Sequence, residues 1–310
     1  MDIVDRIAAG VGLPPATVYQ TARTAGRRYR PIELRIPGKK PRLVYQPATE
    51  LRLIQRWCAD QIFAQLPVHK SCFSYIKGKN IRAHAEMHRR NNFLSRIDIR
   101  RFFPSLTRLN VEDLLNRNLA LLKLKSAEEA NLLSLLATRM GELVIGAPSS
   151  PVLSNALMYD FDEEWSARCE GRGIAYTRYA DDIYVSTNEP NLLSPLITDL
   201  KRNLTSRPGF SFEVNHEKDV FTSRKRLRRV TGITLTPEGN TSIGRKRKRA
   251  IKALIHRALH NALSAEELQS LMGMLAYVDS ADPALSLALK RKYGGPYRQT
   301  LAAQLPGAPS

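Results

Sequence analysis

The stretch GIAYTRYADDIYVS, residues 173–186, places two neighbouring aspartates between two short runs of β-prone residues. The runs are rich in Ile, Tyr, Thr and Val, so we expect two strands joined by a tight turn at Asp181 and Asp182. Adjacent carboxylates repel and raise each other's pKa unless cations compensate. A divalent-metal site is therefore the simplest reason for this pair between apolar strands, and an ordinary aspartate turn is the alternative.

A second stretch, RIDIRRFFPSL at residues 96–106, ends a predicted strand with Asp98 and follows it with two aromatic residues. Two-metal phosphoryl transfer needs carboxylates from separate strands, around ions that lie about 3.5–4 Å apart. Asp98 is the natural third ligand beside Asp181 and Asp182, and a structural cap before a turn is the alternative. Together the two stretches predict a catalytic metal site made by these three aspartates.

The composition points to a nucleic-acid partner. The 310 residues include 48 Lys and Arg against 29 Asp and Glu, a net charge of +19, which favours nucleic acid before anionic membrane. Cys58, Cys72 and Cys169 show no Cys-x-x-Cys spacing, which argues against a disulfide framework or a cysteine zinc site. Acidic residues near the start, and no apolar run of about 18 residues, predict a cytoplasmic protein without a membrane partner.

The N-terminal third shows helix and hairpin patterns. Two short helices are expected before residue 30, broken at Gly10 and restarted by a pair of prolines. Residues 32–37 and 42–47 predict a β-hairpin with cationic residues at its tip. Thr49 is expected to be the N-cap of the next helix. That helix carries a face that we assign to the core: Leu53, Ile54, Trp57 and Ile62.

Helical patterns separate the two aspartate stretches. A helix is expected from Ser126, where Ser-Ala-Glu-Glu matches a capping box, and a single helix over residues 151–167. Strand, helices and hairpin in this order predict an α+β fold with an antiparallel sheet. A later helix is expected to be capped at Ser264, and the tail from Gly294 to be loosely ordered.

A basic segment begins at Arg224. Residues 224–257 hold twelve Lys or Arg and one acid, Glu238, so we place a domain boundary near Arg224. The runs 224–229 and 245–249 are expected to line a nucleic-acid channel, because one acid cannot neutralise so many cations. A solvated helix end is the alternative. The following helix is expected to pack one apolar face: Ile251, Leu254, Ile255, Ala258 and Leu259.

The two aspartate stretches resemble the palm motifs of reverse transcriptases, and the resemblance extends over roughly residues 25–290. It implies a right-hand polymerase fold, with an antiparallel palm sheet and a helical C-terminal thumb. The implied domains are N-terminal helices and fingers over residues 1–92, a palm with interleaved fingers helices over 93–228, and a thumb with a C-terminal tail over 229–310.

The resemblance also implies roles for individual residues. An RNA-directed DNA polymerase of this kind holds two Mg²⁺ ions, here through Asp98, the Ile99 carbonyl, Asp181 and Asp182. Phe103 is placed as the aromatic gate that excludes a 2′-hydroxyl and so selects dNTPs, with core packing as the alternative.

Three further residues are assigned to the nucleotide by the resemblance. Gly146 stands in the nucleotide-positioning loop, but Val-Ile at residues 144–145 replaces the usual Pro-Gln before it. Arg42 resembles the fingers arginine that grips the triphosphate, and Lys218 the palm lysine near the leaving pyrophosphate. The Val-Ile substitution removes a glutamine side-chain contact, whereas backbone approach at Gly146 is retained.

Other features narrow the resemblance to the retron type. Val-Thr-Gly at residues 230–232 matches a triplet characteristic of retron enzymes, and the upstream Asn-Ala-x-x-His region is matched except that His84 replaces Asn. The pair His84 and His88 also raises a zinc site as an alternative. The residues expected to contact RNA are His84, His88, Thr231, Arg245, Arg247 and Arg249.

Retron membership implies partners and products. The expected template and primer is a dedicated structured noncoding RNA that primes from a guanosine 2′-hydroxyl, and the product is RNA-linked multicopy single-stranded DNA. Antiphage defence with a neighbouring effector protein is also implied. A non-enzymatic RNA-binding scaffold with the same fold, and a group II intron-like reverse transcriptase, are the alternatives; the Val-Thr-Gly triplet and the short segment after the expected thumb favour the retron type.

Overall fold

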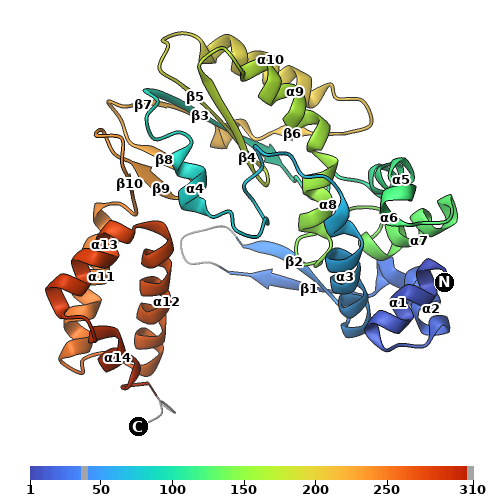
Figure 1. The fold of residues 1–310 in the computed structure, drawn as a ribbon, viewed down its shortest axis with the longest axis horizontal. Helices are drawn as coiled ribbons and strands as arrows, with labels where there is room; N and C mark the ends of the chain where they lie inside the picture. The colour runs from blue at the N-terminus through green and yellow to red at the C-terminus, as the bar shows by residue number, and fades with distance from the viewer. Residues whose placement is uncertain (36–40, 306–310) are drawn as a thin grey trace. The chain divides into compact units, whose positions relative to one another are not determined.

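The computed structural model describes residues 1–35 and 41–305 (Figure 1). Its elements form two compact units, each made from three segments of the chain. The first unit consists of Met1–Ile76, Arg96–Tyr184 and Asn191–Val220, and the second of Lys77–Ser95, Val185–Pro190 and Phe221–Ser310. Within the described ranges, the helices are too short or too polar to cross a membrane.

Helices pack together at the N-terminal end of the first unit. α1 (Ile3–Val11) contacts α2 (Pro15–Thr24) and α3 (Thr49–Gln61), while α7 (Ala127–Ala137) contacts α2 and α5 (Arg108–Arg117). Short helical elements of this unit are α6 (Leu119–Leu122) and the 3-10 helices η1 (Ala25–Arg27), η2 (Phe63–Gln65) and η3 (His216–Lys218).

The first helix continues through Gly10 and ends at Val11. Gly12 follows with φ 71°, the left-handed conformation that commonly ends a helix. A Cβ atom on Gly10 would lie 2.0 Å from Nε1 of Trp57. Glycine is therefore needed at this position so that the indole can pack on the helix backbone, and the expected break at Gly10 is wrong.

Two expectations for α3 are also wrong. Ala48 is the N-cap and Thr49 is the first helical residue, with no side-chain hydrogen bond at the cap. Ile54 and Ile62 are fully buried as expected, but Leu53 is 48% exposed. Leu53 falls beside the buried stripe of the helix, because neighbouring residues lie about 100° apart around its axis.

The expected N-terminal hairpin is present. β1 (Tyr29–Leu34) pairs antiparallel with β2 (Arg42–Pro47), and Tyr29 lies opposite Pro47. The first strand begins three residues earlier than its apolar pattern indicated. Most of its side chains are exposed, so burial does not mark its start. The cationic tip lies within residues 36–40, outside the described residues.

The central sheet is mixed with helices as an α+β fold requires (Figure 1). Its strands are β4 (Ile174–Tyr179), β5 (Asp182–Thr187), β3 (Phe93–Arg100) and β6 (Glu213–Val214) in spatial order, with β7 (Val220–Ser223) also paired with β3. β6 runs antiparallel to β3 and places Val214 opposite Ile99. Helices α9 (Tyr159–Cys169) and α10 (Leu193–Thr205) contact the sheet at β4 and β6.

Two helices stand where a single one was expected over residues 151–167. α8 (Ser150–Leu157) ends before Met158, and α9 begins after it. Met158 has φ −90° and ψ 2°, outside the helical region, and its side chain is 1% exposed. Neither Gly nor Pro marks this position, so the break follows from packing of a buried side chain and has no local signal.

The capping box expected at Ser126 does not form. Ser126 is the N-cap of α7, but its side chain makes no capping hydrogen bond. The carboxylate of Glu129 instead accepts hydrogen bonds from the backbone N–H of Ile3 at 2.9 Å and of Lys125 at 2.7 Å. Glu129 thus binds the first turn of α1, which is a long-range partner that the four-residue pattern cannot show.

The second unit combines a small sheet with helices. The sheet has β10 (Thr241–Ser242), β9 (Ile233–Leu235) and β8 (Arg228–Val230) in that order, and α4 (Ile81–Glu86) contacts each strand. The C-terminal helices are α11 (Arg245–Leu259), α12 (Ala265–Ala281), α13 (Pro283–Tyr293) and α14 (Tyr297–Ala302). The capping box at Ser264 is present, as predicted.

Two expectations for this unit need correction. Part of the tail, Tyr297–Ala302, forms α14, in which Tyr297 and Leu301 are 2% and 0% exposed and which contacts α12. The apolar face of α11 buries Ile251, but Leu259 at its end is 39% exposed. Leu259 belongs to the last turn, where the helix ends before it can be covered.

Candidate active site

The two neighbouring aspartates lie at the predicted hairpin turn. β4 ends at Tyr179 and β5 begins at Asp182, so Ala180 and Asp181 make the connection. The backbone N–H of Ile99 donates a hydrogen bond to the Asp181 carbonyl at 2.9 Å. This bond fixes the end of β3, which carries Asp98, beside the turn.

Asp98 is 4% exposed and bound by two side chains. Lys218 Nζ lies 3.0 and 2.9 Å from its two carboxylate oxygens, and Asn215 Nδ2 donates to Oδ1 at 2.9 Å. The backbone N–H of Asn215 also donates to the Asp98 carbonyl at 2.9 Å. Lys218 therefore lies in the site, as its resemblance indicated, while Asn215 is an addition that the sequence pattern had not singled out.

Asp182 has one carboxylate oxygen without a hydrogen bond. Among the described residues its buried Oδ1 accepts no hydrogen bond, although Arg96 Nε forms an ion pair with it at 3.8 Å. The Tyr184 hydroxyl donates to Oδ2 at 3.4 Å. Burial and the charge of Asp181 together raise the pKa of Asp182 to about 6, against the opposing charge of Arg96. A buried oxygen that lacks a donor is a natural ligand for a cation.

The three aspartates influence one another electrostatically. Burial raises the pKa of Asp181, the charge of Asp98 adds to this, and Lys218 and Arg42 oppose it. All three offer the hard oxygen ligands that Mg²⁺ prefers, so the donor set and the Asp182 oxygen without a hydrogen bond fit a divalent ion. The described residues hold no group of three or more His, Cys, Asp or Glu already arranged around a metal position. The metal-ligand set, with the Ile99 carbonyl, thus stays a prediction.

Gly146 is required by its contact with the hairpin. It has φ 110°, and a Cβ atom there would lie 2.6 Å from the Tyr45 carbonyl oxygen. The backbone N–H of Tyr45 donates to the Ile145 carbonyl at 2.9 Å. The Val-Ile pair at 144–145 therefore contacts β2 through its backbone, and this packing explains the glycine without reference to a nucleotide.

Arg42 and Phe103 lie where they are accessible. Arg42, the first residue of β2, is exposed, and its charge acts on the pKa of Asp181. Phe103 is half-buried, whereas Phe102 is 4% exposed and stacks on Phe212 with ring centroids 6.4 Å apart. Phe102 is the core residue of the pair, and Phe103 keeps an exposed part as a gate requires.

Comparisons with known proteins agree with this geometry. Residues 35–235 match the family model of the reverse transcriptase, the RNA-dependent DNA polymerase. The chain belongs to the reverse transcriptase family. It is 34% identical over 262 residues to the retron Ec83 reverse transcriptase of Escherichia coli, covering 82% of this chain and 83% of that protein. It is 29% identical over 307 residues to the retron Mx65 reverse transcriptase of Myxococcus xanthus, covering 93% and 70%.

This reverse transcriptase is of the retron type and is an RNA-directed DNA polymerase. A solved telomerase from Candida albicans, in complex with a fragment of telomeric RNA, is similar in fold with a TM-score of 0.51 and 12% identity. The alignment covers 93% of this chain and 59% of the telomerase chain. The expected polymerase fold, with an antiparallel palm sheet and helical C-terminal elements, is thereby confirmed, and its family is generally dependent on divalent metal.

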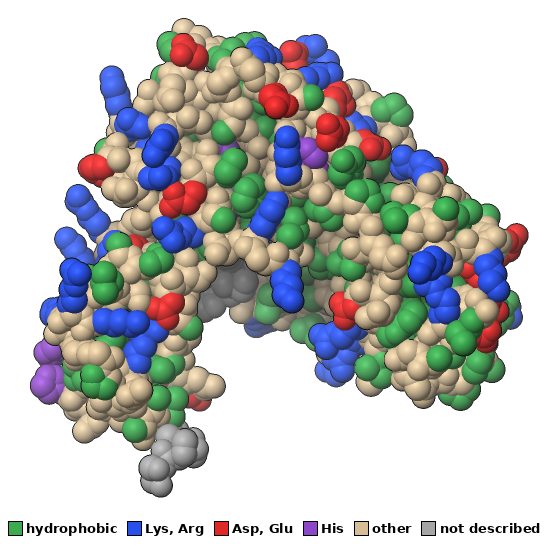
Figure 2. Space-filling model, viewed as in Figure 1, with side chains coloured by type: hydrophobic (Ala, Val, Ile, Leu, Met, Phe, Trp, Pro, Cys, Tyr) green, Lys and Arg blue, Asp and Glu red, His purple; other side chains and the backbone are tan. Residues whose placement is uncertain are grey.

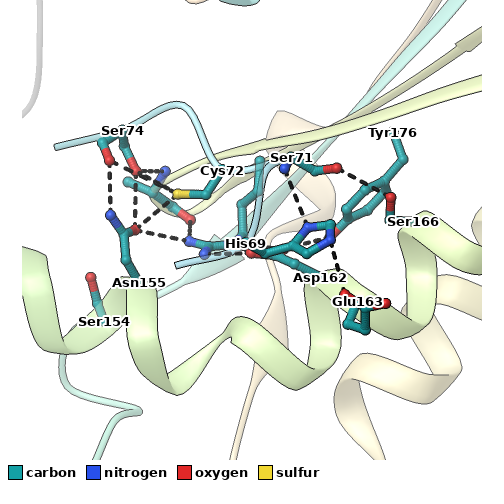
Figure 3. A network of polar contacts seen from close by, with 12 residues as sticks. His69, Ser71, Cys72, Ser74, Ser154, Asn155, Asp162, Glu163, Ser166 and Tyr176 are labelled. Carbon is teal, nitrogen blue, oxygen red and sulfur yellow. Dashed lines mark hydrogen bonds and ion pairs between the residues drawn. The ribbon is translucent and has the colours of Figure 1, made fainter. Parts of the chain in front are cut away.

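A buried polar network joins Ser74, Asn155, Asp162 and Tyr176 (Figure 3). Arg178 and Asp162 form an ion pair at 2.7 Å with both side chains 0% exposed. Ser74 and Asn155 join this network and reach Ala180. No role was assigned to Arg178, Asp162 or Ser74 from the sequence. The available signal was an arginine inside a β-prone strand, which demands a buried partner.

His84 and His88 are not available to RNA in this structure. Both are 0% exposed, and their rings meet edge to face with centroids 5.7 Å apart. Burial lowers the pKa of His84 to about 2 and that of His88 to about 3. His88 Nδ1 lies 2.7 Å from the Ser186 hydroxyl. The expected base contacts are corrected to internal packing, and no three-ligand zinc group accompanies the pair among the described residues.

Thr231 stands at a hairpin turn between β8 and β9. Val230 pairs with Ile233, and Thr231 and Gly232 have φ 46° and 84°, which are the positive values that a type I′ turn needs. The Thr231 hydroxyl lies 3.4 Å from His84 Nδ1. The Val-Thr-Gly triplet thus has a local structural reason, and contact of Thr231 with RNA stays a prediction.

The basic runs are only partly available to a polyanion. Arg245, Arg247 and Arg249 are exposed at the start of α11. Lys248 pairs with Asp282 at 2.8 Å, and Arg228 is 1% exposed, with a hydrogen bond of 3.0 Å to the Thr236 carbonyl. The expectation that all ten cations face nucleic acid is therefore wrong for Lys248 and Arg228. Basic side chains outnumber acidic ones on the face that Figure 2 shows.

Proposed function

We propose that this reverse transcriptase makes RNA-linked multicopy single-stranded DNA from a dedicated structured noncoding RNA. The RNA serves as template and, through a guanosine 2′-hydroxyl, as primer, and dNTPs are the substrates. The observation that carries the proposal is the placement of Asp181 and Asp182 at a turn beside Asp98, in a chain that is 34% identical to a retron reverse transcriptase. Action in antiphage defence, in the cytoplasm and with a neighbouring effector protein, is part of the same proposal.

The catalytic roles follow from the site's charges. Asp98, the Ile99 carbonyl, Asp181 and Asp182 are the groups that would hold two Mg²⁺ ions, whose chemistry in phosphoryl transfer is to stabilise attacking and leaving oxygens. Lys218 has a side chain 47% exposed at the edge of the site. It is placed to neutralise charge on the departing pyrophosphate.

The substrate contacts surround these carboxylates. Arg42 binds the triphosphate, because its exposed guanidinium acts on the charge of Asp181 and offers paired donors to phosphate. Phe103 underlies the sugar and excludes a 2′-hydroxyl. Gly146 keeps its loop against β2, which supports the nucleotide from the hairpin side.

The template RNA is proposed to bind the second unit through its exposed cations. Arg245, Arg247 and Arg249 supply phosphate contacts, and Thr231 at the hairpin turn lies close in the same unit, since Arg247 Nη1 is 3.5 Å from the Gly232 carbonyl. His84 and His88 support this surface from inside and are not themselves RNA ligands.

The domain assignment is also a proposal. Fingers over residues 1–92, palm over 93–228 and thumb over 229–310 follow the resemblance. The compact units divide the chain elsewhere, since Lys77–Ser95 belongs with Phe221–Ser310. Residues 77–92 are therefore a part of the proposed fingers that packs with the proposed thumb's unit.

The nucleic acid that co-purifies with the chain tests the proposal. After expression with its flanking genomic region, the expected product is single-stranded DNA that shortens on RNase treatment and carries a 2′-linked branch. The Asp182→Asn variant is expected to retain the RNA and lack the DNA. RNA alone in both samples would favour the non-enzymatic scaffold, and linear DNA without a branch would favour an intron-like enzyme.

A further inference from the structure

The backbone N–H of Ala180, between the two strands of the catalytic hairpin, is held by a side chain from outside the hairpin. This N–H donates to the Ser74 hydroxyl at 2.9 Å. Asn155 Nδ2 donates to the Ser74 carbonyl at 2.8 Å, and the Ser74 hydroxyl lies 3.3 Å from Asn155 Oδ1. Ser74 and Asn155 are 0% and 1% exposed. The turn is therefore tied to α8 through one buried serine (Figure 3).

The carbonyl of Ala180 is held from the other side. Arg178 Nη1 donates to it at 3.2 Å and lies 3.5 Å from Asn155 Oδ1. The Asp162 carboxylate accepts hydrogen bonds from Nε and Nη2 of the same guanidinium, at 2.9 and 2.7 Å. It also accepts one from the Tyr176 hydroxyl at 2.8 Å. Both polar groups of one turn residue are thus fixed by a continuous buried network.

Ala180 needs such support because its backbone is unfavourable. Its φ is 54°, in the left-handed region that residues with a Cβ atom seldom occupy. Strained backbone of this kind persists where surrounding contacts determine it, and it occurs often at functional sites. Asp181 and Asp182 follow directly, so a relaxation at Ala180 would move both carboxylates.

Ser74 is positioned by the pairing of the preceding backbone with β4. Phe73 N–H donates to the Arg178 carbonyl at 2.8 Å, and Arg178 N–H donates to the Ser71 carbonyl at 2.9 Å. Cys72 and Arg178 form a parallel β-bridge. Residues 71–73 therefore run beside the edge of the sheet, and the next residue reaches the turn.

We propose that Ser74 and Asn155 are positioning residues of this polymerase, which hold Ala180 in its left-handed conformation and so keep Asp181 and Asp182 in register with Asp98. The inference rests on the proposed catalytic role of these aspartates. Ser74 and Asn155 act through the turn and contact neither substrate nor metal. Their loss should slow the chemical step while leaving dNTP binding by other residues largely unchanged.

The test compares Ser74→Ala and Asn155→Ala with a matched control, Ser134→Ala. Ser134 is also a 0% exposed serine, but its hydroxyl bonds to the Asn131 carbonyl at 2.7 Å within α7. For each purified full chain we would measure kcat and KM for dNTP in primer extension across a Mg²⁺ series. Hydrogen–deuterium exchange of the peptide that contains Ala180 gives a second readout that is independent of activity.

In both network variants kcat is expected to fall by about 10- to 100-fold, the size of effect that a small misplacement of reacting groups produces. KM for dNTP should change by less than about threefold, because a group lost only from the reacting geometry lowers kcat and kcat/KM together. The half-saturating Mg²⁺ concentration should rise, and the Ala180 peptide should exchange faster. Ser134→Ala should match the wild-type chain in all four measurements.

A double-mutant cycle separates positioning from general damage. Because Ser74 and Asn155 act through the same turn, kcat of the double variant should lie within about threefold of kcat of the less active single variant. If the two substitutions damaged the structure independently, their fold-reductions in kcat would instead multiply. Wild-type kcat and Mg²⁺ dependence in both single variants would overturn the inference, as would failure of both to fold while Asp181→Asn folds. An active Asp181→Asn variant would overturn the proposed function itself.

Discussion

The turn at Asp181 and Asp182, proposed to be catalytic, and the helix α4 both place polar side chains in apolar surroundings, but they expose them differently. The side chain of Asp182 is 22% exposed and one of its oxygens accepts no hydrogen bond, whereas His84 and His88 are 0% exposed. The residue types suggested a functional role for both regions. The exposed fraction of the side chains supports such a role only at the turn, because a fully buried side chain cannot contact a ligand unless the residues around it unfold.

The largest expected effect is loss of DNA synthesis in Asp181→Asn or Asp182→Asn. Removing one carboxylate from a two-metal site should lower kcat by at least about 1,000-fold, which corresponds to roughly 4 kcal/mol of transition-state stabilisation. Folding and RNA binding should be retained, because the burial that raises the pKa of both groups disfavours their charge. Primer extension with Mg²⁺ and dNTPs measures the effect.

The exposed Asp199 on α10 provides a control for this prediction, since its side chain is 60% exposed. Asp199→Asn should extend primers like the wild-type chain. Full activity in both catalytic variants would remove the turn from the mechanism and would erase its contrast with α4.

A smaller change is expected in sugar selection. Phe103→Ala should raise the efficiency of rNTP relative to dNTP incorporation by about 100-fold, since a removed steric clash restores most of the binding that the pocket denied. Phe102→Ala is the matched control. Its ring is 4% exposed, so the variant should lose about 3–5 kcal/mol of stability without changing the ratio. An unchanged ratio in Phe103→Ala would assign that ring to packing alone.

The histidines of α4 should make the second unit acid-sensitive. Their pKa values, about 2 for His84 and about 3 for His88, lie below the unfolded value near 6.5. The unfolded chain therefore binds protons that the folded chain does not, and stability present above pH 6.5 is lost as the pH falls toward 3. Between pH 7.5 and 5.0 the loss is up to about 2 kcal/mol for each histidine.

Urea unfolding at the two pH values measures this dependence. His88→Gln should remove the part of the pH-dependent loss of unfolding free energy that comes from one histidine. His256→Gln, at an exposed position on α11, should leave the pH dependence unchanged. Equal unfolding free energies of the wild-type chain at pH 7.5 and 5.0 would show that the histidines are hydrated, and the contrast with the catalytic turn would then weaken.

The sequence pattern was sufficient to predict an element where the residues that contact one another are near in sequence. The strands around Asp181, and the capping box at Ser264, are made by contacts within a few residues, and both are present as predicted. The same capping pattern at Ser126 failed because Glu129 binds the N–H of Ile3 at the start of the chain. A four-residue motif cannot show which of two backbone donors its carboxylate will meet.

The candidate site shows the same limit. Asp98 was predictable because a carboxylate in an apolar strand is locally conspicuous, although β3 does not end there and continues to Arg100. Gly146 was singled out from a motif, yet its requirement comes from the Tyr45 carbonyl, which only the folded chain brings within 2.6 Å of a Cβ position. Ser74 carries no local signal, and Asn155 follows the Gly146 loop in a motif that does not show that its side chain meets Ser74. Their role depends on Ala180, from which Ser74 is 106 positions away in the chain.

The smallest expected effects distinguish two neighbouring cations on α11. Arg249 is exposed, whereas Lys248 pairs with Asp282, which also accepts hydrogen bonds from the N–H groups of Ile243 and Leu285. Arg249→Ala should flatten the slope of log affinity against log salt by about 0.9, as one lost duplex phosphate contact does. Lys248→Ala should leave that slope unchanged and instead lower stability by about 1 kcal/mol.

Fluorescence anisotropy of cognate and scrambled RNA across a salt series separates the two outcomes. Adding Arg245→Ala and Arg247→Ala to Arg249→Ala should flatten the slope by about 2–3 in total if all three arginines contact phosphate. Discrimination between the two RNAs should fall less than affinity, because phosphate contacts position the RNA and do not distinguish its bases. An unchanged slope in the triple variant would make these exposed arginines a solvated helix end, and exposure of a cation would then not predict contact with RNA.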